Sequence, residues 1–61
     1  MTKKEIVHKL RLLQDDMKEI SAAMDYYSGT NPLHGKHARE LAGAADIAGE
    51  WADEIEKEAE A

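Results

Sequence analysis

The feature that most constrains this chain is a run of mostly apolar residues whose spacing alternates between four and three positions. This stripe passes through Ile6, Leu10, Leu13, Met17, Ile20, Met24 and Tyr27, and later through His34, His37, Leu41, Ala44, Ala48, Trp51 and Ile55. An apolar stripe that keeps this spacing over three heptads is typical of a helix that packs lengthwise against another helix. The sequence therefore predicts an all-α chain of two helices.

Capping residues predict where the first helix begins and ends. Thr2 and Glu5 have the capping-box spacing, in which each side chain accepts a hydrogen bond from the backbone N–H of the other residue. The helix should end near Tyr27, because Gly29 can adopt the left-handed conformation that closes a helix. We expect this helix to span about 3–27.

A second helix is predicted after a short link. Asn31 is suited to cap its N-terminus, and Pro32 to occupy its first position, where the missing N–H is not needed. This helix should span about 32–59. A link of about three residues favours an antiparallel hairpin, so we expect residues 1–61 to form a single domain.

A ridge of alanines accompanies the stripe of the second helix at one heptad position, at Ala38, Ala45, Ala52 and Ala59. Either the ridge reflects helix propensity alone, or its small side chains let another helix approach closely. Gly43 and Gly49 are unfavourable inside a helix. They are easier to understand where something packs against them, although they could also be tolerated at the surface.

One hairpin cannot cover both stripes, because two helices touch along a single line. The 61-residue chain has no cysteine for a disulfide, so we expect its thin core to be supported by association with further copies. A homodimeric four-helix bundle is the economical solution, with a higher oligomer as the alternative. The expected oligomer interface comprises Ala38, Leu41, Ala45, Ala48, Trp51, Ala52, Ile55 and Ala59. Trp51 is either a large side chain packed opposite Leu10 and Leu13 of the first helix, or a partner-binding hot spot.

Charges at the open end of the predicted hairpin complement each other. Basic residues begin the first helix at Lys3, Lys4, Lys9 and Arg11, and acidic residues end the second at Glu54, Glu56, Glu58 and Glu60. We expect ion pairs between these ends, which set the orientation of the helices more than their stability.

The overall charge of −5 argues against nucleic acid as a partner. Residues 31–61 contain three basic and eight acidic residues, and such a surface repels phosphate backbones. A basic stripe formed by Lys4, Arg11 and Lys18 on the first helix is the one feature that would suit RNA. No apolar run approaches the roughly 20 residues of a membrane span, and no apolar segment follows Lys3 as in a secretion signal, so we expect a cytoplasmic protein.

The sequence contains no pattern typical of an active site. His34, His37 and Glu40 share one side of a helix, but the remaining histidine, His8, lies near the opposite end of the predicted hairpin. We instead expect His37 to pair with Glu40 or Asp25. Because the chain also lacks a Gly-rich phosphate loop and a nucleophile beside a base, we expect no enzyme activity, no cofactor and no metal.

Residues of mixed chemistry are concentrated near the predicted turn: Tyr26, Tyr27, Asn31, His34, Lys36, His37 and Arg39. Aromatic rings, cations and the free N–H groups of a helix start are parts of an anion or nucleotide-phosphate site, and Gly35 leaves the backbone accessible. The alternative is a turn packed by Tyr27 with the other side chains in solvent.

In length, hairpin layout and its Met-Thr-Lys opening, the chain resembles the Rop family of plasmid copy-number regulators, which are dimeric four-helix bundles that bind RNA. It also resembles short phage or prophage proteins of unknown role, through the segment Met24 to Tyr27 and the run His37 to Ile55. The second resemblance implies an accessory protein that inhibits or tunes host machinery, including host defence, by binding.

The sequence therefore predicts a non-enzymatic, oligomeric binding protein, a phage-type inhibitor or regulator of a host protein. One alternative is a protein that sequesters a small nucleotide signal through the residues near the turn. The other alternative is a Rop-like RNA-binding adaptor.

Overall fold

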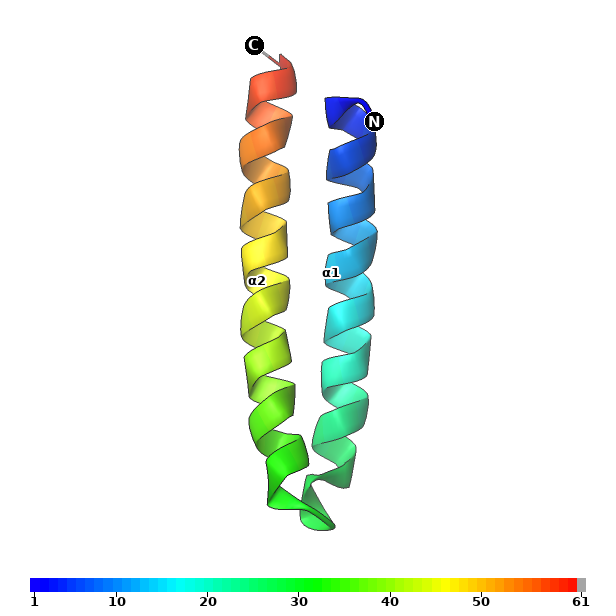
Figure 1. Ribbon diagram of the computed structural model, residues 1–61, viewed down its shortest axis with the longest axis vertical. Helices are drawn as coiled ribbons and strands as arrows, with labels where there is room; N and C mark the ends of the chain where they lie inside the picture. Colours follow the sequence, from blue (N-terminus) through cyan, green and yellow to red (C-terminus); the bar gives the residue numbers. More distant parts are fainter. Residues whose placement is uncertain (61) are drawn as a thin grey trace.

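The computed structural model describes residues 1–60 as an antiparallel helical hairpin (Figure 1). Helix α1 spans Lys3–Tyr26, the short 3-10 turn η1 spans Tyr27–Gly29, and helix α2 spans Pro32–Glu60. The hairpin is 48 Å long and 13 Å across, with both termini at one end. The predicted all-α hairpin is confirmed. Each helix begins at the predicted residue, and its C-terminal end differs from the predicted one by one residue. No helix of the described part is long and apolar enough to cross a membrane.

Both predicted N-terminal caps are present. The Glu5 backbone N–H donates to the Thr2 hydroxyl at 3.1 Å, and the Thr2 N–H donates to the Glu5 carboxylate at 3.4 Å. At the start of α2, the Leu33 N–H donates to the Asn31 side-chain oxygen at 3.0 Å. These bonds satisfy N–H groups that have no partner within the helix, which is why both helices begin where the sequence predicts.

The end of α1 differs from the expectation for Gly29. No glycine among the described residues has a positive φ. The helix instead tightens into η1, where the Thr30 hydroxyl and backbone N–H both donate to the Tyr27 carbonyl, at 2.8 and 3.1 Å. A 3-10 turn thus satisfies the last carbonyl groups without a left-handed residue.

The seam, the line along which the helices meet, is built from small side chains. On α2 it contains Gly35, Ala38, Ala45, Ala48, Gly49 and Ala52, and on α1 Val7, Gln14 and Ser21. Ala45 and Ala52 are 0% exposed. The buried Ser21 hydroxyl donates to the Ala38 carbonyl at 2.7 Å, a bond that requires the two backbones to lie close together. The ridge therefore serves close packing, and helix propensity alone does not explain it.

The two glycines in the middle of α2 have different surroundings. A Cβ atom on Gly49 would overlap the Gln14 side chain, whose Cδ would lie 2.8 Å away, whereas Gly43 has nothing within 4 Å. Gly49 therefore allows the close approach of α1, and Gly43 is a surface position. The packing interpretation therefore holds for Gly49 and the surface interpretation for Gly43.

The seam takes up part of the expected oligomer interface. Four residues expected to contact another chain pack against α1 of the same chain instead: Ala38, Ala45, Ala48 and Ala52. The reason is that a row of methyl groups suits the nearest helix first, and the short link holds α1 beside it. Of the remaining residues, Leu41 and Ile55 are half-buried, Ala59 is exposed, and Trp51 is 55% exposed, so it is not buried against α1.

Candidate functional site

The apolar stripes of both helices lie on one side of the hairpin. In each helix a stripe residue directly precedes a seam residue: Leu13 precedes Gln14, Ile20 precedes Ser21, Ala44 precedes Ala45 and Trp51 precedes Ala52. One residue corresponds to a rotation of about 100° around a helix. Because the helices run in opposite directions, the same rotation away from the seam brings the two stripes to the same side.

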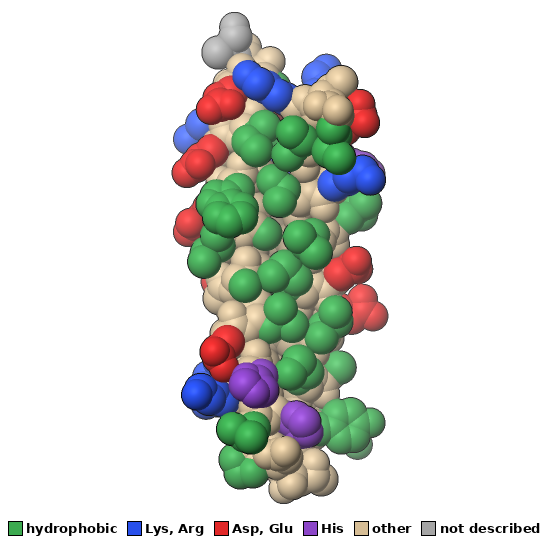
Figure 2. Space-filling model, viewed as in Figure 1, with side chains coloured by type: hydrophobic (Ala, Val, Ile, Leu, Met, Phe, Trp, Pro, Cys, Tyr) green, Lys and Arg blue, Asp and Glu red, His purple; other side chains and the backbone are tan. Residues whose placement is uncertain are grey.

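We call this side the apolar face, and Figure 2 looks directly onto it. It consists of Ile6, Leu10, Leu13, Met17, Ile20 and Met24 of α1, of Tyr27 of η1, and of His34, His37, Leu41, Ala44, Trp51 and Ile55 of α2. Apolar side chains form a band along both helices, with charged side chains along its borders (Figure 2). Four of its large members are about half exposed, and its other large apolar side chains are half-buried. Leu13 is 49% exposed, Ile20 51%, Trp51 55% and Tyr27 57%.

Near the turn, the apolar face contains a shallow hollow of about 300 Å³ between the helices. Its walls are Ile20, Ala23, Met24, Tyr27 and His34. The rings of Tyr26 and Tyr27 form a T-shaped pair with centroids 5.1 Å apart, a favourable arrangement for two aromatic rings. The hollow is open and lined almost entirely by carbon, so it suits an apolar side chain better than a phosphate group.

The residues predicted as a nucleotide site are not brought together. Tyr27 and His34 line the hollow on the apolar face, whereas Arg39 lies on the other side of the seam, beside Gly35 and in a hollow that Lys18 also lines. Successive residues point in different directions around a helix, so Lys36 projects about 200° away from His34.

Two further residues of that set are already occupied. The Asn31 side chain caps α2, and His37 Nδ1 lies 3.0 Å from a Glu40 carboxylate oxygen, the pairing expected for this histidine. Tyr26 is 82% exposed. The polar groups of the turn therefore face several directions.

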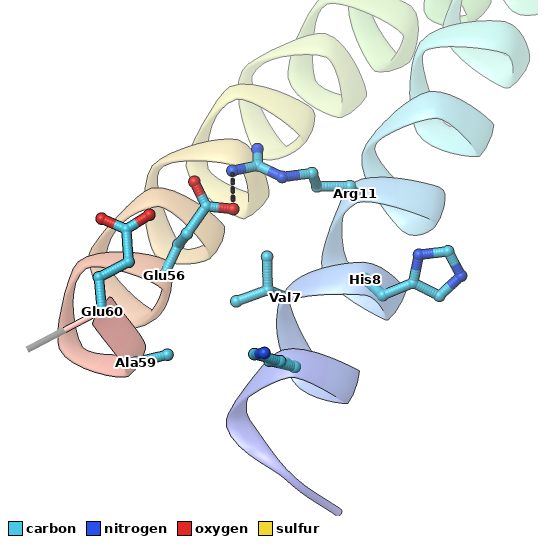
Figure 3. Close-up of a pocket in the computed structure, with 7 residues that line it drawn as sticks. Val7, His8, Arg11, Glu56, Ala59 and Glu60 are labelled. Carbon is cyan, nitrogen blue, oxygen red and sulfur yellow. Dashed lines mark hydrogen bonds and ion pairs between the residues drawn. The ribbon is translucent and has the colours of Figure 1, made fainter.

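The side of the hairpin opposite the apolar face is charged. Arg11 reaches from α1 to α2 and donates to Asp53 at 3.1 Å. It also donates to Glu56 at 3.3 Å (Figure 3). Both hydrogen bonds raise the pKa of Arg11, and the bond to Asp53 has the larger effect. The basic stripe suggested for RNA therefore has its central residue held by two carboxylates, which reduces its attraction for phosphate.

A hollow of about 520 Å³ lies beside Arg11 at the open end of the hairpin (Figure 3). Val7 and Ala59 form its apolar floor, and Lys4, His8, Arg11, Glu56 and Glu60 surround it. Charges of both signs line it, so no single ligand charge is favoured. Ala59, expected in the oligomer interface, lies here.

The predicted ion pairs at the open end form in part. Besides the two pairs of Arg11, Lys3 lies 3.8 Å from Glu58. Lys4 and Glu60 were expected to take part but have no ion pair within residues 1–60, and the same holds for Lys9 and Glu54. Lys9 on α1 and Glu54 on α2 are exposed on the outer borders of the apolar face.

Within residues 1–60, no three His, Asp or Glu side chains are grouped so that they could hold a metal ion. Comparisons with protein-family models, with curated proteins and with solved structures find no match to this chain. The apolar face is the candidate functional site, because the fold of one chain leaves its apolar side chains partly exposed to solvent.

Proposed function

We propose that the chain is a non-enzymatic protein-binding module that associates with itself through the apolar face. The observation that carries this proposal is the placement of both apolar stripes on one side, with four large side chains about half exposed. A soluble monomer rarely exposes a continuous apolar surface of this kind, and such surfaces mark protein contacts. The resulting assembly is a homodimeric four-helix bundle.

The size of the face suits such an assembly. A stable interface buries about 800 Å² on each partner, and the chain exposes 4628 Å², so about a sixth of its surface would be needed. One broad side of an elongated hairpin supplies that share. Burial of the face would also give the chain the large side chains that its own seam lacks.

The second part of the proposal is that the assembled protein acts in the cytoplasm as an inhibitor or regulator of a host protein, as the phage-type resemblance implies. The support for it is the acidic character of α2, whose outward carboxylates include Asp46, Glu50 and Asp53 around a shallow hollow on the charged side. An acidic helical surface can occupy a basic site on another protein. This surface stays free when the apolar face is covered.

Self-association is tested by sedimentation equilibrium of two matched variants. Ile20 on the apolar face and Leu12 on the outer side of α1 are equally exposed, at 51% and 52%. Ile20→Gln should raise the dissociation constant of the dimer by about 100-fold, because two copies of a side chain lose burial worth about 1.5 kcal/mol or more each. Leu12→Gln should leave it unchanged. Equal effects, or a 6.8 kDa species for the wild type at all concentrations, would contradict the proposal.

Host binding is tested separately by pull-down from a host lysate with the wild type and with the variant Asp46→Lys/Glu50→Lys. A basic protein retained by the wild type and lost by the charge-reversed variant supports the acidic surface as its site. Retention by both variants equally would show that the acidic surface takes no part.

A further inference from the structure

We infer that the second copy covers the apolar face with its turn beside the turn of the first copy, so that α1 of each chain packs on α2 of the other. This inference rests on the proposed self-association and adds its geometry. A face that meets its own copy closes around a two-fold axis. If that axis runs along the helices, the turns lie together; if it runs across them, the turns lie at opposite ends, with α1 on α1 and α2 on α2.

Contacts within the hairpin establish which residues lie at the same height. Ser21 bonds to Ala38, Gln14 lies against Gly49, and Lys3 pairs with Glu58. Following the same register, Met17 lies level with Ala44, Ile20 with Leu41, Leu10 with Trp51, and Lys9 with Glu54. With the turns together, residues at one height in α1 and α2 face each other across the two chains.

Side-chain sizes favour this arrangement. The stripe of α1 contains only large side chains, whereas the stripe of α2 has a small exposed side chain near mid-height, at Ala44. With the turns together, Met17 of one chain meets Ala44 of the other. Large side chains placed opposite small ones fill an interface without voids.

The opposite arrangement pairs like with like. At mid-height it would place the Ala44 region of α2 against the same region of the other copy, and Leu13 of α1 against Met17 and Ile20 of the other copy. Around mid-height the α2 helices would then meet through small side chains and the α1 helices through large ones, which leaves voids or strain.

Charges at the borders of the face favour the same choice. Lys9 and Glu54 have no ion-pair partner within residues 1–60, and with the turns together Lys9 of each chain faces Glu54 of the other. With the turns at opposite ends, Glu54 comes near Glu40 of the other copy, and Asp16 comes near its own copy. Like charges facing each other across an interface oppose association.

Spin labelling at the turn distinguishes the two arrangements. The chain has no cysteine, so Gly29→Cys carries a single label, and that position has nothing within 4 Å. With the turns together, the two labels of a dimer should lie within about 20 Å, or about two helix diameters. With the turns at opposite ends, they would lie about one hairpin length, 48 Å, apart. Gly43→Cys, which is also open and lies near mid-height, is the control and should give similar distances in both cases.

Charge reversal gives an independent test, read as the dimer dissociation constant at low salt. Lys9→Glu and Glu54→Lys should each weaken association by about tenfold, since each creates two repulsive contacts. The double variant Lys9→Glu/Glu54→Lys should restore the wild-type value, and an equimolar mixture of the single variants should form a heterodimer. A dimer whose Gly29 labels lie a hairpin length apart, with no restoration in the double variant, overturns the orientation and leaves self-association standing. A chain that stays monomeric overturns both.

Discussion

The seam and the apolar face differ in the size of their side chains, and the smaller side chains are the more deeply buried. Alanines and glycines fill the seam, where Ala45 and Ala52 are fully covered, while Ile20 and Trp51 on the face are about half exposed. Fully burying a side chain of the size of leucine or isoleucine contributes about 1.5–3 kcal/mol, considerably more than a methyl group does. The hairpin therefore obtains its shape from the seam, but most of its available hydrophobic stabilisation lies on the face.

The comparison explains why close packing and exposure occur together. Small side chains let α1 and α2 approach until the Ser21 hydroxyl reaches the Ala38 carbonyl. Helices that lie so close leave little room between them for large side chains, which must then project to one side. In this hairpin they project to the same side from both helices, and this produces a surface suited to contact with another protein.

The largest expected effect comes from placing a charge in the seam. Ala45→Glu should unfold the hairpin, because a carboxylate at a position that is 0% exposed would be buried without a partner. We expect a loss of several kcal/mol, which is comparable with the whole stability of a chain of this size. Circular dichroism should show loss of the helical signal at every concentration. Gly43→Glu introduces the same side chain two positions away, where space is open, and should stay helical. A helical Ala45→Glu variant would show that the ridge does not form the seam.

The next effect comes from the face. Trp51 and Ala52 are consecutive, but Trp51 is 55% exposed and Ala52 is fully buried. Trp51→Ala should leave the hairpin's internal contacts intact and raise the dimer dissociation constant by about 100-fold or more, since a large aromatic side chain is lost from each copy. Analytical ultracentrifugation measures the association. If the association were unchanged and the helical content lower, Trp51 would instead stabilise the single hairpin.

How well the sequence predicts a feature depends on how far apart in the chain the residues that determine it lie. The capping box of Thr2 and the cap at Asn31 are formed by residues within three positions of each other, and both are correct. The sequence does not predict in the same way whether the alanine ridge or the stripe through Ala44 faces α1, because these two rows of α2 differ only by a rotation of about 100°. The choice depends on how closely the backbones approach, and the periodicity does not contain that distance.

The turn illustrates the opposite limit. Residues close in sequence suggested one site, but His34, Lys36 and Arg39 point in different directions from a helix. A count of angles around the expected helix separates them without the structure, because His34 and Lys36 differ by about 200° whichever row of α2 faces α1. The exposure of Trp51 does depend on which row forms the seam, so the periodicity alone does not predict it.

A smaller effect is expected from the two central glycines. Replacing Gly by Ala in a helix stabilises it by about 1 kcal/mol when the position is open. Gly43→Ala should gain about this amount. Gly49→Ala should gain clearly less, because the new methyl group displaces the Gln14 side chain from the seam. Urea unfolding of both variants at one protein concentration measures the difference, and equal gains would show that Gln14 moves aside without loss.

The smallest effect is expected on the charged side, where Arg11 pairs with Asp53 and Glu56 in solvent. Arg11→Met keeps a long apolar side chain but removes both ion pairs, so it should lower the melting temperature slightly at low salt. The difference from the wild type should disappear near 1 M salt, where charges are screened within about 3 Å. The hydrogen bonds raise the pKa of an arginine that is already charged at every ordinary pH, so the difference should not change between pH 6 and 9. Lys18→Met is the matched control, because it removes a cation away from the apolar face that has no ion pair within residues 1–60, and it should have no effect. A loss for Arg11→Met that persists at high salt would mean that this side chain supports the hairpin by packing beside Val7 and Ala59, and the charged side would then contribute to stability as the seam does.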